Sequence, residues 1–117
     1  MNKKYQRYIE FIAKDIEAPY FINMSDTYGL RPDEYKLVLS KVFNQPITIK
    51  GRDVYNTNGN LIYYEYSNGY WSKSEYDNNG NIIYYEYSNG DWSKSEYDDN
   101  GNLIYREDSD GYIIDNR

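Results

Sequence analysis

The C-terminal half of the chain repeats with a period of 21 residues, and this regularity constrains the fold more than any other feature. Residues 55–75 and 76–96 are almost identical, and residues 97–117 follow the same pattern until they diverge after Tyr105. Repeats of this kind are typical of arrays in which each unit packs on its neighbours. The sequence therefore predicts three consecutive units of one small motif.

Two turn signals recur in every unit and predict β-hairpins. Within the units, the signals are Asn68-Gly69, Asn89-Gly90 and Asp110-Gly111. These dipeptides tolerate the positive φ that a two-residue hairpin loop requires. Between the units, Asn58-Gly59, Asn79-Gly80 and Asn100-Gly101 suit three-residue loops with a left-handed glycine and a bulge. Residues 47–117 are therefore predicted to form an antiparallel β-meander of hairpin repeats.

The loop lengths fix a predicted register. A two-residue loop at Asn68-Gly69 would pair Tyr66 with Trp71, Tyr64 with Lys73 and Ile62 with Glu75. A three-residue loop at residues 78–80 would pair Tyr76 with Ile82 and Glu75 with Ile83. Because side chains alternate along a strand, this register keeps equivalent residues of successive units on the same face.

The two predicted faces differ in composition. One face carries Ile62, Tyr64, Tyr66, Trp71, Lys73 and Glu75 with their equivalents, and the other carries Leu61, Tyr63, Glu65, Tyr70, Ser72, Ser74 and Tyr76 with theirs. We expect the first face to pack against the rest of the protein, because it is richer in large rings. Cross-strand aromatic pairs contribute about 0.2–1 kcal/mol each, so such a sheet needs no deep core.

Residues 1–46 are predicted to form a helical region with two helices. The first spans residues 3–17, where Tyr5, Tyr8, Ile9, Ile12 and Ile16 recur at helical spacing. The second begins near Pro32 and ends before Pro46, and residues 25–31 between the helices are expected to be a loop. The fold class is therefore α+β, and the helices are expected to cover one face or one end of the meander.

Composition argues against catalysis and metal binding. The chain contains no His and no Cys, which removes the commonest general base and the usual zinc ligands. Its carboxylates, such as Asp98-Asp99 and Glu107-Asp108, lie in turns and at strand ends, where solvated charge is expected. The segment Asp108-Ser109-Asp110-Gly111 resembles the start of a calcium loop but lacks the later EF-hand ligands. We therefore expect a non-enzyme with no cofactor and no metal site.

Charge is distributed unevenly along the chain. Residues 1–50 carry eight Lys/Arg and six Asp/Glu, a net charge of +2, whereas residues 51–117 carry five and thirteen, a net charge of −8. An acidic array would repel nucleic acid directly, but it would attract the basic groove of a nucleic-acid-binding protein. No segment approaches the roughly 20 apolar residues of a membrane span, and charged residues interrupt the N-terminal stretch where an export signal would lie. A cytoplasmic protein is expected.

Three resemblances bear on these units. The segments Tyr76-Asp77-Asn78-Asn79-Gly80-Asn81-Ile82 and Tyr97-Asp98-Asp99-Asn100-Gly101-Asn102-Leu103 resemble the YD repeats of RHS-type proteins, which implies β-hairpin repeats. Ser67-Asn68-Gly69-Tyr70-Trp71 and Ser88-Asn89-Gly90-Asp91-Trp92 resemble choline-binding cell-wall repeats. In size and acidity the chain is similar to small phage and mobile-element inhibitors of bacterial defence, including anti-CRISPR proteins, which would act in the host cytoplasm.

The functional expectation is a binding protein that engages a bacterial defence or nucleic-acid-handling protein. The expected partner-binding residues are Tyr66, Trp71, Tyr87, Trp92, Glu86, Asp91, Glu96 and Asp98. The alternative is a glycan- or cell-surface-binding repeat module, with ligand held in the ring-lined grooves between units. A third alternative is a homodimer formed through a sheet face or through the outer strand, which contains Tyr112-Ile113-Ile114.

Overall fold

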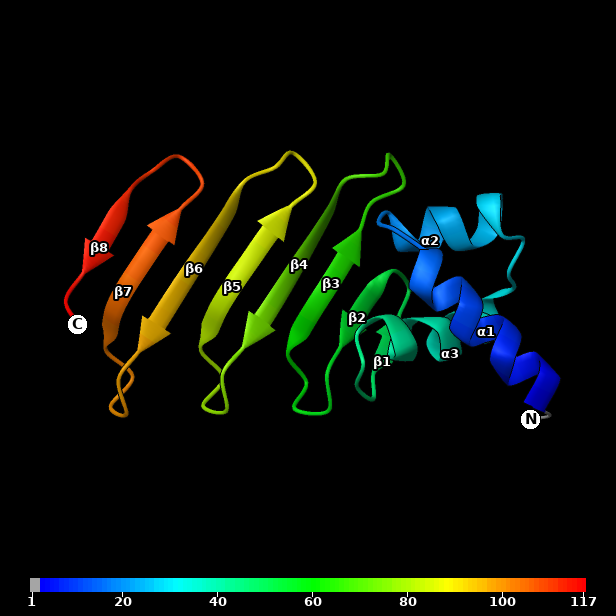
Figure 1. Cartoon of the computed structure of the whole chain (residues 1–117), viewed down its shortest axis with the longest axis horizontal. Coiled ribbons are helices and arrows are strands. Elements are labelled where there is room, and N and C mark those ends of the chain that lie inside the picture. The colour runs from blue at the N-terminus through cyan, green and yellow to red at the C-terminus, as the bar shows by residue number, and fades with distance from the viewer. Residues whose placement is uncertain (1–2) are drawn as a thin grey trace.

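The computed structural model describes the backbone of residues 3–117 and the side chains from residue 7 onward. In this part of the chain, three α-helices precede one eight-stranded antiparallel sheet (Figure 1). The helices are α1 (Lys3–Asp15), α2 (Tyr20–Ile22) and α3 (Pro32–Val42), with the π-helix η1 (Asn23–Thr27) directly after α2. The predicted α+β class, with its helical part first, is confirmed.

The strands follow one another in the sheet in the order of the sequence, and every neighbouring pair is antiparallel. They are β1 (Thr48–Lys50), β2 (Asp53–Tyr55), β3 (Leu61–Glu65), β4 (Trp71–Tyr76), β5 (Ile82–Tyr87), β6 (Trp92–Tyr97), β7 (Leu103–Asp108) and β8 (Ile113–Asp115). Each connection is short, so the sheet is the predicted up-and-down meander. It makes the molecule elongated, with extents of 50 × 28 × 23 Å.

Helix α1 buries one face, as its spacing predicts. Ile9 and Ile12 are buried, as is Ile16 directly after the helix, whereas Tyr8 is 48% exposed. These positions recur every three or four residues, which places them on one side of a helix. The predicted helix continued to residue 17, two residues beyond the observed end. The side chain of Tyr5, which belongs to the predicted stripe, lies outside the described residues.

Helix α3 begins where the sequence predicts it. Pro32 is its first residue, where the missing proline N–H costs nothing. The backbone N–H of Arg31 donates to Glu34 Oε1 at 3.0 Å, which closes the N-terminal turn. Val38 and Leu39 are fully buried, so this helix contributes much of the core beside α1.

The prediction of two helices joined by a loop at residues 25–31 is wrong. Helix α2 and the π-helix η1 occupy residues 20–27, and the Tyr28 N–H donates to the Asn23 carbonyl, a bond that spans five residues. Tyr20 and Phe21 are 6% and 3% exposed, and Met24 is completely buried. Packing of these three side chains stabilises a helical path that local propensity does not favour.

The predicted two-residue loop at Asn68-Gly69 is also wrong. The Tyr66 N–H donates to the Tyr70 carbonyl at 2.8 Å, so the loop contains three residues, Ser67 to Gly69. Gly69 adopts φ +91°, whereas Asn44 is the only described non-glycine residue with a positive φ. A three-residue loop requires one left-handed residue, whereas a two-residue type I′ loop requires two. The observed loop therefore leaves Asn68 unstrained.

This extra loop residue shifts the register by one. Tyr63 pairs with Lys73 and Glu65 pairs with Trp71, where the prediction had Tyr64 with Lys73 and Tyr66 with Trp71. At the next connection, the predicted pair of Tyr76 with Ile82 is confirmed. The predicted partner of Glu75 is wrong, however, because a bulge at Ile83 brings Tyr84 opposite Glu75.

The observed faces are therefore not the predicted ones. The helix-side face, against which the helices pack, carries Tyr63, Glu65, Trp71, Lys73, Glu75, Tyr84, Glu86, Trp92, Lys94, Glu96, Tyr105, Glu107, Ile113 and Asp115. The far face carries Tyr64, Tyr66, Tyr70, Ser72, Ser74, Tyr85, Tyr87, Ser93, Ser95, Arg106, Asp108 and Ile114. The expectation that the face of Tyr64 and Tyr66 packs is wrong, because a one-residue slip exchanges the faces of one strand.

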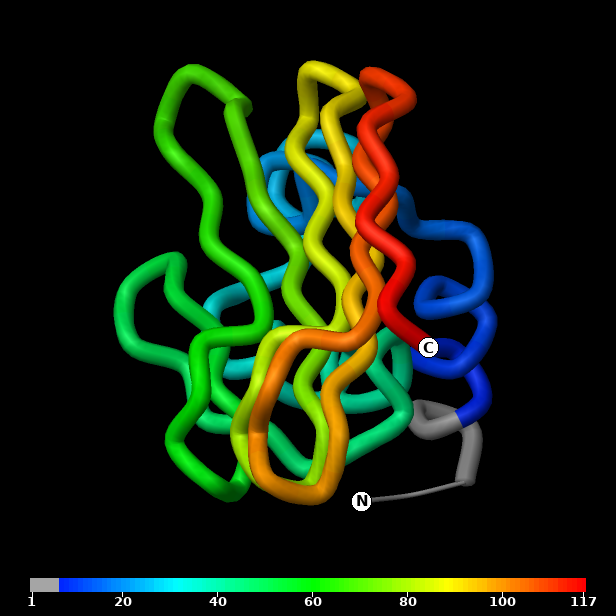
Figure 2. Tube along the Cα trace, turned by 90° about the vertical axis from the view of Figure 1, so that its left-hand side faces the viewer, coloured from blue at the N-terminus to red at the C-terminus, as the bar shows by residue number. Residues whose placement is uncertain are grey.

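The core joins the helices to the first strands only. It includes Ile12, Met24 and Leu39 from the helical part and Val54 and Tyr63 from the sheet. From β5 to the end of the chain, Ser93 is the only buried residue. Seen from the β8 end, the strands lie one behind another and turn progressively, with α1 on one side of them (Figure 2). Strands β5–β8 therefore form a single layer with both faces open to solvent, while the helices cover one end of the meander.

Candidate binding surface

The first hairpin, β3–β4, binds the helical part of the chain through a buried carboxylate. Glu65 is 3% exposed, and its two oxygens accept backbone N–H bonds from Phe21 and Ile22, each at 2.9 Å. The hydroxyl of Tyr63 also donates to Glu65, and the Tyr20 N–H donates to the Tyr63 hydroxyl at 3.0 Å. The carboxylate therefore receives three hydrogen bonds that compensate its burial.

Aromatic and cationic groups complete this contact. The ring of Tyr20 lies 5.0 Å from the ring of Tyr63, and Lys73 Nζ lies 5.0 Å from the Tyr20 ring centroid. Lys73 Nζ is also 4.9 Å from the Trp71 ring, so the ammonium group lies close to two ring faces. Burial, and then the hydrogen bond to Glu65, raise the pKa of Tyr63 far above its usual range. Tyr63 is therefore a neutral donor at every physiological pH.

The second hairpin, β5–β6, carries the same four side chain types in the same register. Tyr84 pairs with Lys94 and Glu86 pairs with Trp92, as Tyr63 pairs with Lys73 and Glu65 with Trp71. Lys94 Nζ lies 5.3 Å from the Trp92 ring centroid. We call Tyr84, Glu86, Trp92 and Lys94 the second-hairpin site. None of the four is buried.

The third hairpin, β7–β8, keeps only half of this arrangement. The Tyr105 hydroxyl donates to Glu107 at 3.2 Å, as Tyr63 does to Glu65. The positions of the tryptophan and the lysine are taken by Ile113 and Asp115, however. The guanidinium group of Arg117 lies 4.0 Å from the Tyr105 ring centroid and covers it. The second-hairpin site is therefore the complete and uncovered copy.

The eight predicted binding residues do not form one surface. Trp71, Glu86, Trp92 and Glu96 lie on the helix-side face, whereas Tyr66 and Tyr87 lie on the far face. Asp91 and Asp98 lie in loops at opposite ends of the strands. Tyr84 and Lys94 belong to the same surface as Trp92 but were not among the predicted binding residues. The one-residue register error placed Tyr84 on the opposite face, whereas Lys94 was already on the face of Trp92.

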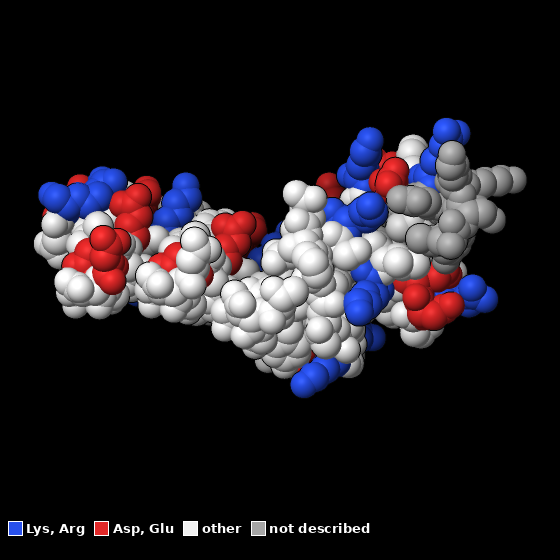
Figure 3. Space-filling model, turned by 90° about the horizontal axis from the view of Figure 1, so that it is seen from below, with Lys and Arg blue, Asp and Glu red and all other residues white. Residues whose placement is uncertain are grey.

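The uncovered part of the helix-side face has charges of both signs. Its carboxylates are Glu75, Glu86, Glu96, Glu107 and Asp115, and its cations are Lys94 and Arg117, with Lys73 at the border of the helical part beside Tyr20. Lysine and glutamate face each other across strands at two points, in the pairs Lys73 with Glu86 and Lys94 with Glu107. Figure 3 shows positive and negative side chains next to one another along the upper edge of the thin part of the molecule.

Much of the remaining negative charge lies in the loops, where it has a structural role. Asp98 Oδ1 accepts the backbone N–H groups of Asn100 and Asn102, at 3.0 and 2.8 Å. These bonds, led by the one from Asn102, lower the pKa of Asp98. Asp77 makes the same bonds in the preceding loop, and its pKa is also lowered. The loop aspartates thus fix the turns and also contribute to the acidity of the array.

The far face carries a row of tyrosine rings. Neighbouring centroids lie 5.3 Å apart for Tyr64 and Tyr66, 5.9 Å for Tyr66 and Tyr70, and 6.2 Å for Tyr70 and Tyr87. Tyr85 continues the row 5.2 Å from Tyr87. Because the rings are partly exposed and Tyr66 is 56% exposed, the row offers a flat aromatic platform.

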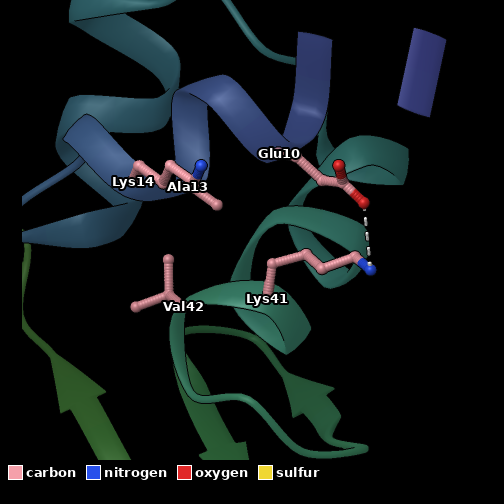
Figure 4. Close-up of a pocket in the computed structure, with 5 residues that line it drawn as sticks. All are labelled: Glu10, Ala13, Lys14, Lys41 and Val42. Atoms are coloured by element: carbon pink, nitrogen blue, oxygen red, sulfur yellow. Dashed lines mark ion pairs between the residues drawn. The ribbon is translucent and has the colours of Figure 1, made fainter. Parts of the chain in front are cut away.

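Two of the hollows next to the helices have charged side chains in their walls. One lies between α1 and α3, where Lys41 and Glu10 form a 3.5 Å ion pair to one side of Ala13 and Val42 (Figure 4). Both charges of that pair are about half exposed, so the pair contributes little to stability. The other hollow has a volume of about 300 Å³ and lies where the helical part meets the sheet. Its walls include Tyr20, Phe43, Gln45, Lys73, Tyr84 and Glu86.

Within residues 3–117 as described, no three His, Cys, Asp or Glu side chains gather in a way that would hold a metal ion. None of the described helices is long and apolar enough to cross a membrane. No protein-family model matches the chain, and no curated protein is significantly similar to it. The assignment of function therefore depends on the residues of this chain alone.

Proposed function

We propose that this chain is a non-catalytic protein-binding module, whose partner binds the uncovered half of the helix-side face. The supporting observation is the second-hairpin site, which has the same four residue types that bind α2 in the first hairpin. Trp92 and Tyr84 supply large, stiff rings, which are the side chains that dominate protein interfaces. Lys94, Glu86 and Glu96 surround them with charges that can orient a partner.

The electrostatic part of the proposal concerns the choice of partner. Residues 51–117 carry a net charge of −8, which favours encounter with a basic surface, especially at low salt. A bacterial defence protein or a nucleic-acid-handling protein has such a surface. The proposal therefore includes a phage-type inhibitory role in the cytoplasm of a host cell, similar to that of anti-CRISPR proteins.

The architecture is part of the same proposal. We propose that β3–β8 are tandem hairpin repeats similar to YD repeats, with Tyr-Asp at the start of the loops at residues 77–81 and 98–102 and Tyr-Asn at the start of the equivalent loop before β3. In support, Asp77 and Asp98 accept equivalent hydrogen bonds in equivalent loops, and Asn56 does so in the first. An array of this kind displays one binding set per unit, and the second unit is the one left open.

The test is retention of host proteins on the immobilised chain at low and at high salt. A helix-side variant, Trp92→Ala with Glu96→Gln, is compared with a far-face variant, Tyr66→Ala with Tyr85→Ala. We expect a specific host protein to be retained at low salt, released at high salt and lost only with the helix-side variant. Loss only with the far-face variant, or retention indifferent to salt, would contradict the proposal.

The tyrosine row supports a second candidate, a glycan- or cell-surface-binding module. Flat rings in line on an open face can stack against sugar rings, and the far face has no helix over it. Trp71 and Trp92 lie on the opposite face, so tryptophan fluorescence would not report such binding. Titration with cell-wall sugars or choline, followed by the NMR signals of the tyrosine rings, tests this candidate. Unchanged signals would exclude it.

A further inference from the structure

The structure contains one complete example of how a hairpin of this array recognises another segment. In β3–β4, Glu65 accepts the backbone N–H groups of two consecutive residues, Phe21 and Ile22. The preceding residue, Tyr20, places its ring near the Tyr63 ring and the Lys73 ammonium group. The recognised element is therefore the start of a helical turn. It has an aromatic residue followed by two residues whose backbone N–H groups are bound by the glutamate.

The second hairpin presents the same recognition groups without an occupant. Its aromatic, acidic and cationic side chains occupy the same positions in the same register. Lys94 is already stacked on Trp92 as Lys73 is on Trp71, so this half of the site is arranged before any segment binds. In the described part of the chain, no amide or hydroxyl group donates a hydrogen bond to Glu86.

We infer that the second-hairpin site binds a segment of the partner protein that begins a helical turn with an aromatic residue. Two backbone N–H groups of that segment donate to Glu86, the Tyr84 hydroxyl accepts a third, and the aromatic ring packs against Tyr84 and Lys94. This inference rests on the proposed protein-binding function and specifies the chemistry of what is bound.

The site has room for such a segment beside α2. Equivalent strands of successive hairpins are two strand spacings apart, which is about 10 Å, and a helix with its side chains is about 10 Å wide. The hollow of about 300 Å³ beside the site includes Phe43 and Gln45 in its wall, together with Tyr84 and Glu86. A bound segment would therefore lie alongside the chain's own helices and gain contact with α3 and the residues after it.

A second copy of this chain is a poor occupant. Its own matching segment is part of its core, because Tyr20 and Phe21 are 6% and 3% exposed. Releasing that segment would expose these rings and leave Glu65 buried without its donors. The third hairpin is also a poor site, since Ile113 and Asp115 stand where the ring and the cation are needed.

The experiment uses the full chain and a synthetic peptide with the sequence of residues 18–28, acetylated and amidated. The indole N–H signals of the two tryptophans are followed by NMR during titration. We expect a saturable shift of the Trp92 signal, with little change at Trp71, whose site is occupied. Glu86→Gln should weaken peptide binding about tenfold, because charge-assisted hydrogen bonds to the amides are lost. The control variant Asp99→Asn, which removes a carboxylate in the exposed loop between β6 and β7, should leave binding unchanged.

Several results would overturn the inference. They are the absence of a saturable shift, a shift confined to Trp71, and equal affinity of the wild type and Glu86→Gln. Unchanged backbone amide spectra of both variants show that the fold is intact. If the peptide does not bind while host-protein retention still depends on Trp92 and Glu96, the proposed function stands and only the chemistry of the bound segment is wrong.

Discussion

Replacement of Glu65 by alanine should weaken the contact between the helical part and the sheet more than replacement of any other polar residue. Glu65 accepts hydrogen bonds from the Phe21 and Ile22 amides and from the Tyr63 hydroxyl. Alanine accepts none, and two of these three donors lie in buried residues. Each buried donor left without a partner costs about 1–3 kcal/mol. The expected loss in the free energy of unfolding is therefore about 2–6 kcal/mol.

Urea unfolding followed by near-ultraviolet circular dichroism measures this loss. A loss of that size should lower the urea midpoint by roughly 1–3 M for a chain of this length. Glu86→Ala is the matched control, because Glu86 occupies the same position in the next hairpin without these donors. Its free energy of unfolding should change by about 0.5 kcal/mol or less. Glu65→Gln keeps one acceptor oxygen and should fall between the two.

Amide hydrogen exchange adds a local test. In Glu65→Ala, the N–H groups of Phe21 and Ile22 should lose protection first, before the amides of the central strands. Equal losses of stability in the Glu65 and Glu86 variants would refute the reasoning. They would mean that the buried hydrogen bonds of the first hairpin do not hold the helices, and the template for partner binding would lose its basis.

Three further exchanges test the core, a loop and a titrating group. Leu39→Ala should lower the free energy of unfolding by about 2–5 kcal/mol because Leu39 is fully buried, whereas Leu37→Ala on the same helix should cost under about 1 kcal/mol, both by urea unfolding. Gly90→Ala should cost about 1 kcal/mol, because Gly90 has φ +96° and no neighbour within 4 Å of an added Cβ; a neutral result in urea would contradict the strain argument. The pKa of Asp98 is lowered by backbone N–H groups, so its stabilising effect is present above about pH 4 and is lost as the pH falls through the folded-state pKa. The stability difference between the wild type and Asp98→Ala should therefore shrink in acid, and a difference that stays constant would contradict it.

The loop at Asn68-Gly69 shows why the sequence revealed a repeat but did not predict how its strands pair. An Asn-Gly pair fits both a two-residue and a three-residue loop. Nothing else in the sequence distinguishes the two loop lengths. The choice depends on the backbone conformation of Asn68, which stays out of the left-handed region when the loop has three residues. One residue of error moved Tyr63 and Glu65 to the wrong face, which hid the contact with α2.

The chain alone determined the local elements. Periodic apolar residues gave α1 and α3, Asn-Gly and Asp-Gly pairs gave the turns, and the alternation of tyrosine with serine and glutamate gave a thin antiparallel sheet. These features depend on contacts between near neighbours, which a sequence pattern records directly.

Only the tertiary structure decided which face the helices cover and which hairpin remains open. The helical path through Tyr20 and Phe21 follows from burial against Tyr63 and Glu65, residues more than 40 positions away along the chain. Two hairpins with the same side chains therefore have different environments, because there is one helical part and it packs at one end of the array. No local sequence pattern contains that difference in burial. Because of it, the Glu65 carboxylate holds α2 on the sheet, whereas we propose that Glu86 binds a partner.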